Sequence, residues 1–382
     1  MSLKLKLLAV VLAAHIAAAQ EVHIGVLGLF HPHQLILKTV PVQALVIEAR
    51  DQGRQKTYVL ERSSGVDAAQ ITLSGDQLIL QVGDQVVRTS DVRVVSRGTA
   101  AAEFILAVPG KISRHYRGVL DVKAGSGVLV PVIAMDLETA VASAVQAESD
   151  PDTPLEALKA QAVATRSYFV AGRRQHHDFD FCDTTHCQFL REPPPPDSDF
   201  SRATLATGGL VLAYRDQAVA AMFARSCGGR TRTPQEVGLS NNNDSYPYFP
   251  VACDYCLHNP WRWSRRVSPS EAADLEKGGE SFRLAVDRQR GWDAVPSNNF
   301  TLRKDGDDVI LEGAGQGHGI GLCQRGSKAM AQAGASFRQI LDHYYPNTTL
   351  IPAISAADRS GASTRWANSR AALPSQELPF AK

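Results

Sequence analysis

Glu148 is the residue whose type and position in this 382-residue sequence most clearly suggest acid–base chemistry. Apolar residues recur before it at spacings of three and four, as on one face of a helix that begins near Asp136. They are Leu137, Ala140, Val141, Ala144 and Val145. Glu148 is next on that face, and burial would raise its pKa toward that of a general acid. The alternative is that the helix ends at Gln146 and that Glu148 points into solvent.

A second predicted helix contains a competing acid, Glu156. Thr153 followed by Pro154 and Glu156 fits a capping box, in which the glutamate reaches back to the first backbone N–H. A stripe then runs through Leu155, Leu158, Ala162, Thr165 and Phe169, and Gly172 is a plausible end. Capping gives Glu156 a structural role, which leaves Glu148 as the candidate catalytic acid.

Thiol and imidazole side chains gather in one short segment that contains Cys182, His186 and Cys187, with His176 and His177 just upstream. This spacing can wrap one zinc ion, although an oxidising compartment would favour a disulfide between the two cysteines. For Cys253 and Cys256 we expect a disulfide, either with each other or with cysteines elsewhere. A thiol-redox function is disfavoured because no thioredoxin-like alternation of strands and helices surrounds this pair.

A glycine-rich block surrounds His318. Gly315, Gly317, Gly319 and Gly321 alternate around the histidine, so the backbone can approach a bound chain closely and present the imidazole to it. In the structural alternative, the block is a glycine-rich turn and the histidine is satisfied within the core.

The chain begins with features of a secretory signal peptide over residues 1–19. Lys4 and Lys6 precede an apolar run, and Ala17 and Ala19 form a small-residue cleavage site. We therefore expect an exported protein of the periplasm or cell envelope, with no transmembrane segment after cleavage. A net charge of +1 argues against strong attraction to nucleic acid.

The expected fold class is α+β. Short strand patterns such as Val22–Leu27 and Gln77–Val82 predict a β-rich N-terminal domain over 20–127. A mixed α+β domain is expected over 128–352. The last residues, 353–382, lack periodicity and are expected to form a flexible tail.

The second region resembles the SpoIID/LytB family. The resemblance rests on Glu148 followed by the helix signature Leu155–Ala164, and on four further blocks in order. These are Cys182–Gln188, Ser226–Thr231, Gly315–Gly321 with Gln324, and His343–Pro346. The sequence departs from the family where Ser149 and Asp150 replace a Met-Pro pair, and where Gln316 and Arg325 replace tryptophans. Like-charge repulsion from Asp150, two residues from Glu148, is also expected to raise the pKa of Glu148.

The resemblance implies a peptidoglycan lytic transglycosylase in which one glutamate, Glu148, serves as acid and then base, assisted by His318. The expected products end in 1,6-anhydro-N-acetylmuramic acid. The implied substrate-binding residues are Gln188, Ser226, Cys227, Gly228, Gly229, Gln316, Gly317, Gly319 and Gln324. It also implies a structural zinc ion held by Cys182, His186 and Cys187.

A second hypothesis is a catalytically silent peptidoglycan-binding module that stimulates a cell-wall amidase, as implied by the enhancer branch of the same family. The altered Met-Pro pair and the missing tryptophans favour it. Retention of Glu148, Cys182, His186 and His318 together favours the enzyme.

Overall fold

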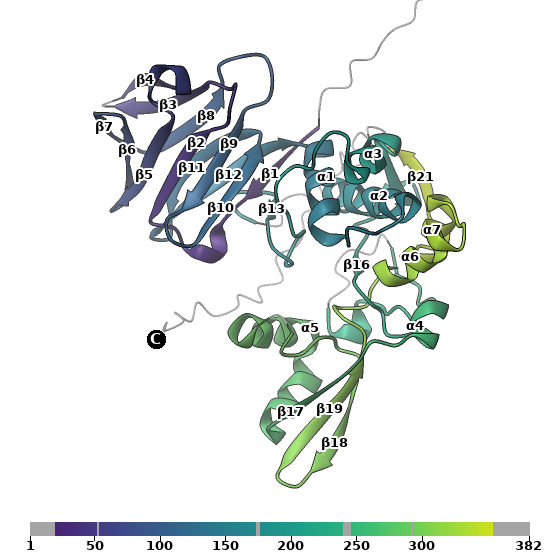
Figure 1. Cartoon of the computed structure of the whole chain (residues 1–382). Coiled ribbons are helices and arrows are strands. Elements are labelled where there is room, and N and C mark those ends of the chain that lie inside the picture. Colours follow the sequence, from purple (N-terminus) through teal and green to yellow (C-terminus); the bar gives the residue numbers. More distant parts are fainter. Residues whose placement is uncertain (1–19, 52, 173–175, 240–245, 292, 354–382) are drawn as a thin grey trace, which may run out of the picture.

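The computed structural model describes residues 20–51, 53–172, 176–239, 246–291 and 293–353. The predicted signal peptide and the predicted tail beyond Ala353 lie outside these residues. The α+β fold class is confirmed: antiparallel sheets come first in the chain, and helices with small sheets follow (Figure 1).

Two sheets form the N-terminal part. The first is β13 (Phe181–Cys182), β1 (Glu21–Gly25), β12 (Val128–Asp136), β11 (Val119–Gly125), β8 (Asp91–Ser96), β3 (Leu45–Asp51) and β4 (Arg54–Leu60). The second is β10 (Ile112–Arg117), β9 (Glu103–Val108), β2 (Gln34–Thr39), β5 (Ala68–Ser74), β6 (Gln77–Val82) and β7 (Gln85–Thr89). Alternate residues along the strands, such as Leu78 and Leu80 of β6, are buried in one shared core. The predicted strand Gln77–Val82 is therefore confirmed.

The N-terminal sheet continues past the expected domain boundary at residue 127. Strand β12 hydrogen-bonds to both β11 and β1, and it leads directly into helix α1 (Leu137–Glu148). Strand β13, from the loop after the second helix, pairs with β1 in parallel. The sheet thus fixes both the start of α1 and the segment that carries Cys182.

Helix α1 follows the sequence prediction closely. The Asp136 carboxylate accepts a hydrogen bond from the Thr139 N–H at 3.0 Å, which satisfies a free donor of the first turn. The predicted apolar stripe is buried against α2 (Leu155–Ala171) and α3 (Asp199–Ala206). Gly172 ends α2 as expected.

A buried ion pair joins these helices. Arg166 of α2 is fully buried and holds the Glu138 carboxylate of α1 with two nitrogens, Nε at 2.8 Å and Nη2 at 2.6 Å. Its guanidinium also donates to the backbone oxygens of Thr204 and Leu210. Arg166 therefore connects four segments of the chain.

The predicted capping box at α2 is wrong. The N-cap is Pro154, with no side-chain hydrogen bond there. Glu156 instead accepts hydrogen bonds from Lys159 Nζ at 2.6 Å and from the Phe337 N–H at 2.8 Å. Phe337 opens α7 (Phe337–Tyr344), so Glu156 satisfies a free donor of a helix that is distant in sequence.

Glu156→Ala should lower the free energy of unfolding by about 1 kcal/mol, because the Phe337 N–H loses its charged acceptor. Glu156→Gln is the matched control, since its amide oxygen can still accept that bond. Urea denaturation of the two variants and the wild type measures the difference. A loss of activity in stably folded Glu156→Ala would contradict the structural role.

The rest of the chain forms small sheets and helices. Three sheets comprise β15 (Gln217–Ala218), β14 (Leu210–Tyr214) and β21 (Thr349–Pro352); β16 (Phe223–Ala224) and β20 (Leu322–Cys323); and β17 (Arg262–Val267), β19 (Asp308–Ala314) and β18 (Phe300–Asp305). The remaining helices are α4 (Asp254–His258), α5 (Pro269–Arg290) and α6 (Gln324–Gln332). Across the described ranges, no helix combines the length and the apolar character needed to cross a bilayer.

Candidate functional site

Glu148 is the last residue of α1, and two distant segments hold it. The Phe189 N–H donates to Glu148 Oε1 at 3.1 Å, and the Gln324 side-chain amide donates to the Glu148 backbone carbonyl at 2.9 Å. The helix therefore continues past Gln146, and the carboxyl group is engaged with protein. The alternative in which Glu148 simply points into solvent does not hold.

Burial raises the pKa of Glu148 to about 7. The Phe189 N–H and the charges of Arg225 and Arg191 act in the opposite direction, but desolvation is the larger effect. The repulsion expected from Asp150 is not a cause of this rise, because Asp150 forms an ion pair with Arg225 at 2.7 Å. A group with this pKa can donate a proton and later accept one near neutral pH.

A short parallel sheet brings residues to Glu148 from two directions. Strands β16 and β20 pair through Phe223 with Leu322 and through Ala224 with Cys323. Arg225 and Gln324 are the next residues after these strands, and both act on Glu148. Sequence analysis identified Gln324 but missed Arg225, Arg191 and Phe189.

The two glycine-containing blocks predicted to bind substrate lie against each other. The Gln316 N–H donates to the Ser226 carbonyl at 2.8 Å, and the Ser226 N–H donates to the Gln316 carbonyl at 3.1 Å. Gly228, Gly317 and Gly319 all have positive φ. At Gly228 a side chain would collide with the Ala314 carbonyl, so this close approach of backbones requires glycine.

Three predicted substrate-binding side chains are buried. Cys227 is 3% exposed and faces the protein interior, so its side chain does not line a substrate groove as expected. Ser226 is 2% exposed, and Gln188, which precedes Phe189, is 5% exposed. None of the three side chains is presented to solvent.

The imidazole of His318 is engaged with backbone. Its Nδ1 accepts a hydrogen bond from the Ile320 N–H at 3.0 Å. Burial lowers its pKa, and the charges acting on it are those of Glu280 and Arg283. The imidazole also hydrogen-bonds to the backbone of Phe223 in β16. The contacts of His318 therefore lie in the glycine-rich block, on β16 and toward α5, and none among the described residues is a hydrogen bond to Glu148.

A cavity of about 260 Å³ opens beside Phe189. It is lined by Leu27, Leu29, Phe30, Arg114, Asp183, Thr184, Thr185 and Phe189. Another cavity, of about 610 Å³, lies over β17, β18 and β19 and contains none of the predicted catalytic residues. Glu148 lines neither cavity, but Phe189 lines the smaller one and its backbone N–H donates to the Glu148 carboxylate.

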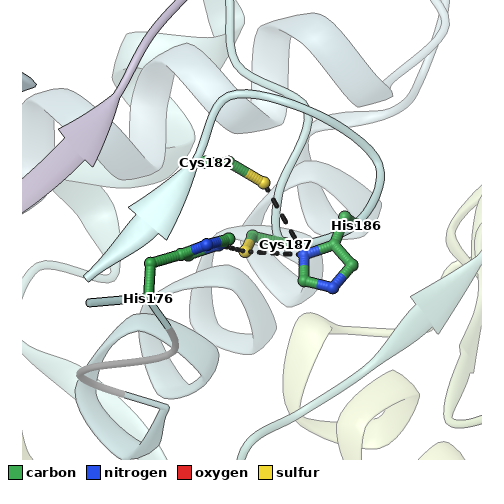
Figure 2. A group of neighbouring side chains, drawn as sticks. All are labelled: His176, Cys182, His186 and Cys187. Atoms are coloured by element: carbon green, nitrogen blue, oxygen red, sulfur yellow. Dashed lines mark hydrogen bonds between the residues drawn. The ribbon is translucent and has the colours of Figure 1, made fainter. Parts of the chain in front are cut away.

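Two thiols and two imidazoles converge around β13 (Figure 2). His176 Nε2 lies 3.2 Å from Cys187 Sγ, and His186 Nδ1 lies 3.5 Å from Cys187 Sγ and 3.7 Å from Cys182 Sγ. Hydrogen bonding from Cys187, His176 and His186 lowers the pKa of Cys182, which favours a thiolate. These four residues form a ligand set that can hold a structural metal ion.

The structure decides between the two upstream histidines. His176 joins the cluster, whereas the side chain of His177 is 97% exposed and pairs with Asp178. The three ligands predicted from the sequence thus lie together, and His176 is the fourth member.

A second group of thiols was not predicted. Cys227, Cys253, Cys256 and Cys323 lie together in the interior, with their sulfur atoms within 4.8 Å of one another. All six cysteines have free thiols, so the expectation of a disulfide for Cys253 and Cys256 is wrong. The Cys253-x-x-Cys256 spacing was the signal in the sequence that could have indicated a metal-binding group.

Part of this chain is similar to a known protein family. Residues 126–214 match the model of the SpoIID family, described as stage II sporulation protein. This range contains Glu148, all four residues of the His/Cys cluster, and Phe189.

Three curated proteins are also similar to this chain. The chain is 28% identical to an uncharacterized protein of Brachyspira hyodysenteriae, with 62% of this chain and 72% of that protein covered. It is 50% identical to the amidase enhancer of Bacillus subtilis, over 51% of this chain and 38% of the enhancer. It is 23% identical to stage II sporulation protein D of Bacillus amyloliquefaciens, over 57% of this chain and 74% of that protein.

Proposed function

We propose that this chain is an exported peptidoglycan lytic transglycosylase, because its residues 126–214 match the model of the SpoIID family. Its substrate is a glycan strand, cleaved between N-acetylmuramic acid and N-acetylglucosamine. The observation that carries this proposal is Glu148: the Phe189 N–H holds its carboxyl group, the Gln324 amide holds its backbone carbonyl, and burial raises its pKa to about 7.

In the proposed mechanism Glu148 acts twice. Its neutral carboxyl group first donates a proton to the glycosidic oxygen as the bond to C1 breaks. The resulting carboxylate then accepts the proton of the muramic acid C6 hydroxyl, whose oxygen attacks C1 and closes the 1,6-anhydro ring. Oε1 is held by the Phe189 N–H, so we assign the proton transfers to Oε2.

The neighbouring carboxylates support a mechanism with a single acid. Asp150 is paired with Arg225, and Asp183 is paired with Arg114 at 3.1 Å and accepts the Leu27 N–H at 3.1 Å. A hydrolase requires a second carboxylate to activate water or to attack the anomeric carbon. Both nearby candidates for that role are engaged in protein contacts.

The remaining site residues have supporting roles in this proposal. The cavity beside Phe189 holds part of the strand, and the Phe189 ring supplies an apolar surface for a sugar face. The paired blocks Ser226–Gly229 and Gln316–Gly319 form a backbone surface on the side of the strand that faces away from Phe189. His318 orients this surface through Ile320, which makes it a positioning residue.

A structural zinc ion is proposed to bind to His176, Cys182, His186 and Cys187, which lie before, within and after β13. We expect about one equivalent of zinc at this cluster, because two thiolates and two imidazoles satisfy tetrahedral zinc. Elemental analysis of Cys182→Ser/Cys187→Ser against wild type measures it. An unchanged zinc content, or oxidation of both cysteines in the wild type, would contradict this assignment.

A second candidate function is stimulation of a cell-wall amidase by peptidoglycan binding. It is favoured by the 50% identity to a protein named amidase enhancer and by Ser149 and Asp150 after Glu148. In that case Glu148 would be a retained but unused residue, and the protein partner would be the amidase.

One experiment separates the two functions. The purified full-length protein is incubated with glycan strands lacking stem peptides, and the products are examined by mass spectrometry. Fragments with 1,6-anhydro ends are expected. Intact strands would favour the enhancer function, and reducing ends that carry oxygen from labelled water would identify a hydrolase.

The rate of cleavage should depend on the protonation of Glu148. Because its pKa is raised to about 7, the neutral acid is present below that pH and is lost as the pH rises through it. Arg225→Gln should move this descending limb to higher pH, since the Arg225 charge lowers the pKa of Glu148. A pH profile of kcat for both proteins tests this, and a limb near pH 4.5 in the wild type would contradict it.

A further inference from the structure

The four-cysteine group joins three separate segments of the chain. Cys227 lies just after β16, Cys253 and Cys256 lie at the start and within α4, and Cys323 ends β20 as the N-cap of α6. Each of the four is at most 3% exposed. They lie in the apolar core that α6 and α7 cover, so their thiols face one another and not solvent.

The spacing of the sulfur atoms suits one ion. A tetrahedral metal with metal–sulfur bonds of about 2.3 Å places its sulfur ligands about 3.8 Å apart. Here Cys256 Sγ and Cys323 Sγ lie 3.6 Å apart, and all four ligand atoms lie within 4.8 Å of one another. An iron–sulfur cluster would place several irons and sulfides between the thiolates and hold them farther apart.

The surrounding polar groups are arranged to stabilise thiolates. Cys323 Sγ accepts hydrogen bonds from the backbone N–H of Cys227 and of Gly326, both at 3.4 Å. The Tyr344 hydroxyl lies 3.4 Å from Cys253 Sγ, and the Ser226 hydroxyl lies 3.6 Å from Cys256 Sγ. Four thiols without a partner would gain little from this set of donors, whereas metal-bound thiolates are negatively charged acceptors.

We propose that Cys227, Cys253, Cys256 and Cys323 bind a single zinc ion in a tetrahedral, all-thiolate site. This is a second metal site, separate from the His/Cys cluster, and it does not depend on the proposed catalytic activity. Four soft thiolates in a closed, apolar environment form a complete ligand shell for zinc, which identifies the site as structural.

The position of this site gives it a specific role. Cys323 immediately precedes Gln324, whose amide holds the Glu148 carbonyl, and Cys227 lies two residues after Arg225. Gly326 packs so closely on Cys253 and Tyr344 that a side chain there would collide with both. The ion therefore links the segment after β16, helix α4 and the start of α6, close to the residues that contact Glu148.

The test uses full-length protein in which the first cluster is removed and the second is intact. Cys182→Ser/Cys187→Ser should retain about one equivalent of zinc, and X-ray absorption should show about four sulfur neighbours at about 2.3 Å. Wild-type protein with both sites filled should show an average of about three sulfur neighbours and one nitrogen neighbour. The wild-type measurement decides the matter if the double variant does not fold.

Cys256→Ser/Cys323→Ser provides the converse variant. It should lose one equivalent of zinc, and the remaining metal should show mixed sulfur and nitrogen coordination. Absence of zinc from Cys182→Ser/Cys187→Ser, or wild-type spectra with only two sulfur neighbours per zinc, would overturn the proposal. So would disulfides among these four cysteines, detected by alkylation and mass spectrometry under denaturing, non-reducing conditions, or iron in place of zinc.

Discussion

Glu148→Gln should lower the rate of glycan cleavage by about a hundred- to ten-thousand-fold, the range that general acid–base groups contribute. The amide oxygen can still accept the Phe189 N–H, so the fold and the position of the side chain are retained. The amide has no proton to donate and cannot serve as the later base. Release of anhydro-ended fragments from glycan strands measures the loss.

The neighbouring acid supplies the control. Asp150→Asn changes a carboxylate two residues away that is paired with Arg225, and it should retain most of the activity. It should also lower the pKa of Glu148 slightly, because the Arg225 charge is then no longer balanced. Comparable losses in Glu148→Gln and Asp150→Asn, or substantial turnover by Glu148→Gln, would move the catalytic role away from Glu148.

Glu148→Gln, although it lowers activity, should raise the free energy of unfolding relative to the wild type at high pH. The folded state holds the Glu148 proton up to a pH of about 7, whereas the unfolded chain releases it near 4.5, so wild-type stability falls as pH rises between these values. The neutral amide of Glu148→Gln avoids this loss, which amounts to at most about 3 kcal/mol. Urea denaturation at pH 5 and pH 8 measures this: the free energy of unfolding of Glu148→Gln should exceed that of the wild type only at pH 8.

Arg166→Met should lower the free energy of unfolding by about 3–5 kcal/mol, the range for breaking a buried ion pair from one side. Arg166 is fully buried and donates to Glu138, Leu210 and Thr204. Its loss leaves the two carbonyls without this donor. Glu138 is 38% exposed and can be hydrated, which places the expected value at the lower end of the range.

A surface pair on the neighbouring helix is the matched control. Arg202 and Asp199 of α3 form an i,i+3 pair at 2.7 Å, but both side chains are more than half exposed. Arg202→Met should therefore change stability by less than about 1 kcal/mol. Equal effects of the two substitutions in chemical denaturation would show that Arg166 does not have the connecting role that its contacts indicate.

The elements around Glu148 were predictable where the signal is local. The stripe from Leu137 to Val145 repeats with the helical period, and that periodicity alone predicts Glu148 as the next residue on the same face of the helix. Cys182, His186 and Cys187 lie within one short segment of the sequence, so their side chains are close together because the residues are close in sequence. Short-range patterns such as these can be predicted from the sequence without knowing how the rest of the chain folds.

Predictions failed where a side chain had a choice of partner. Glu156 lies where a capping box is expected, yet it accepts the Phe337 N–H, 181 residues away. Asp150 was expected to repel Glu148, yet it pairs with Arg225, 75 residues away. In both cases the local and the distant interaction contribute similar free energies. Which of them forms therefore depends on which group the fold brings within reach.

The sequence by itself determined the α+β class, the two central helices, the acid at the end of the first helix and three members of the His/Cys cluster. Only the tertiary structure decided that Phe189 and Gln324 fix this acid, that His176 and not His177 completes the cluster, and that four distant cysteines meet. Cys227 and Cys323 are 96 residues apart. Their meeting depends on the parallel pairing of β16 with β20, and such long-range pairing results from the packing of the whole core, which no local pattern encodes.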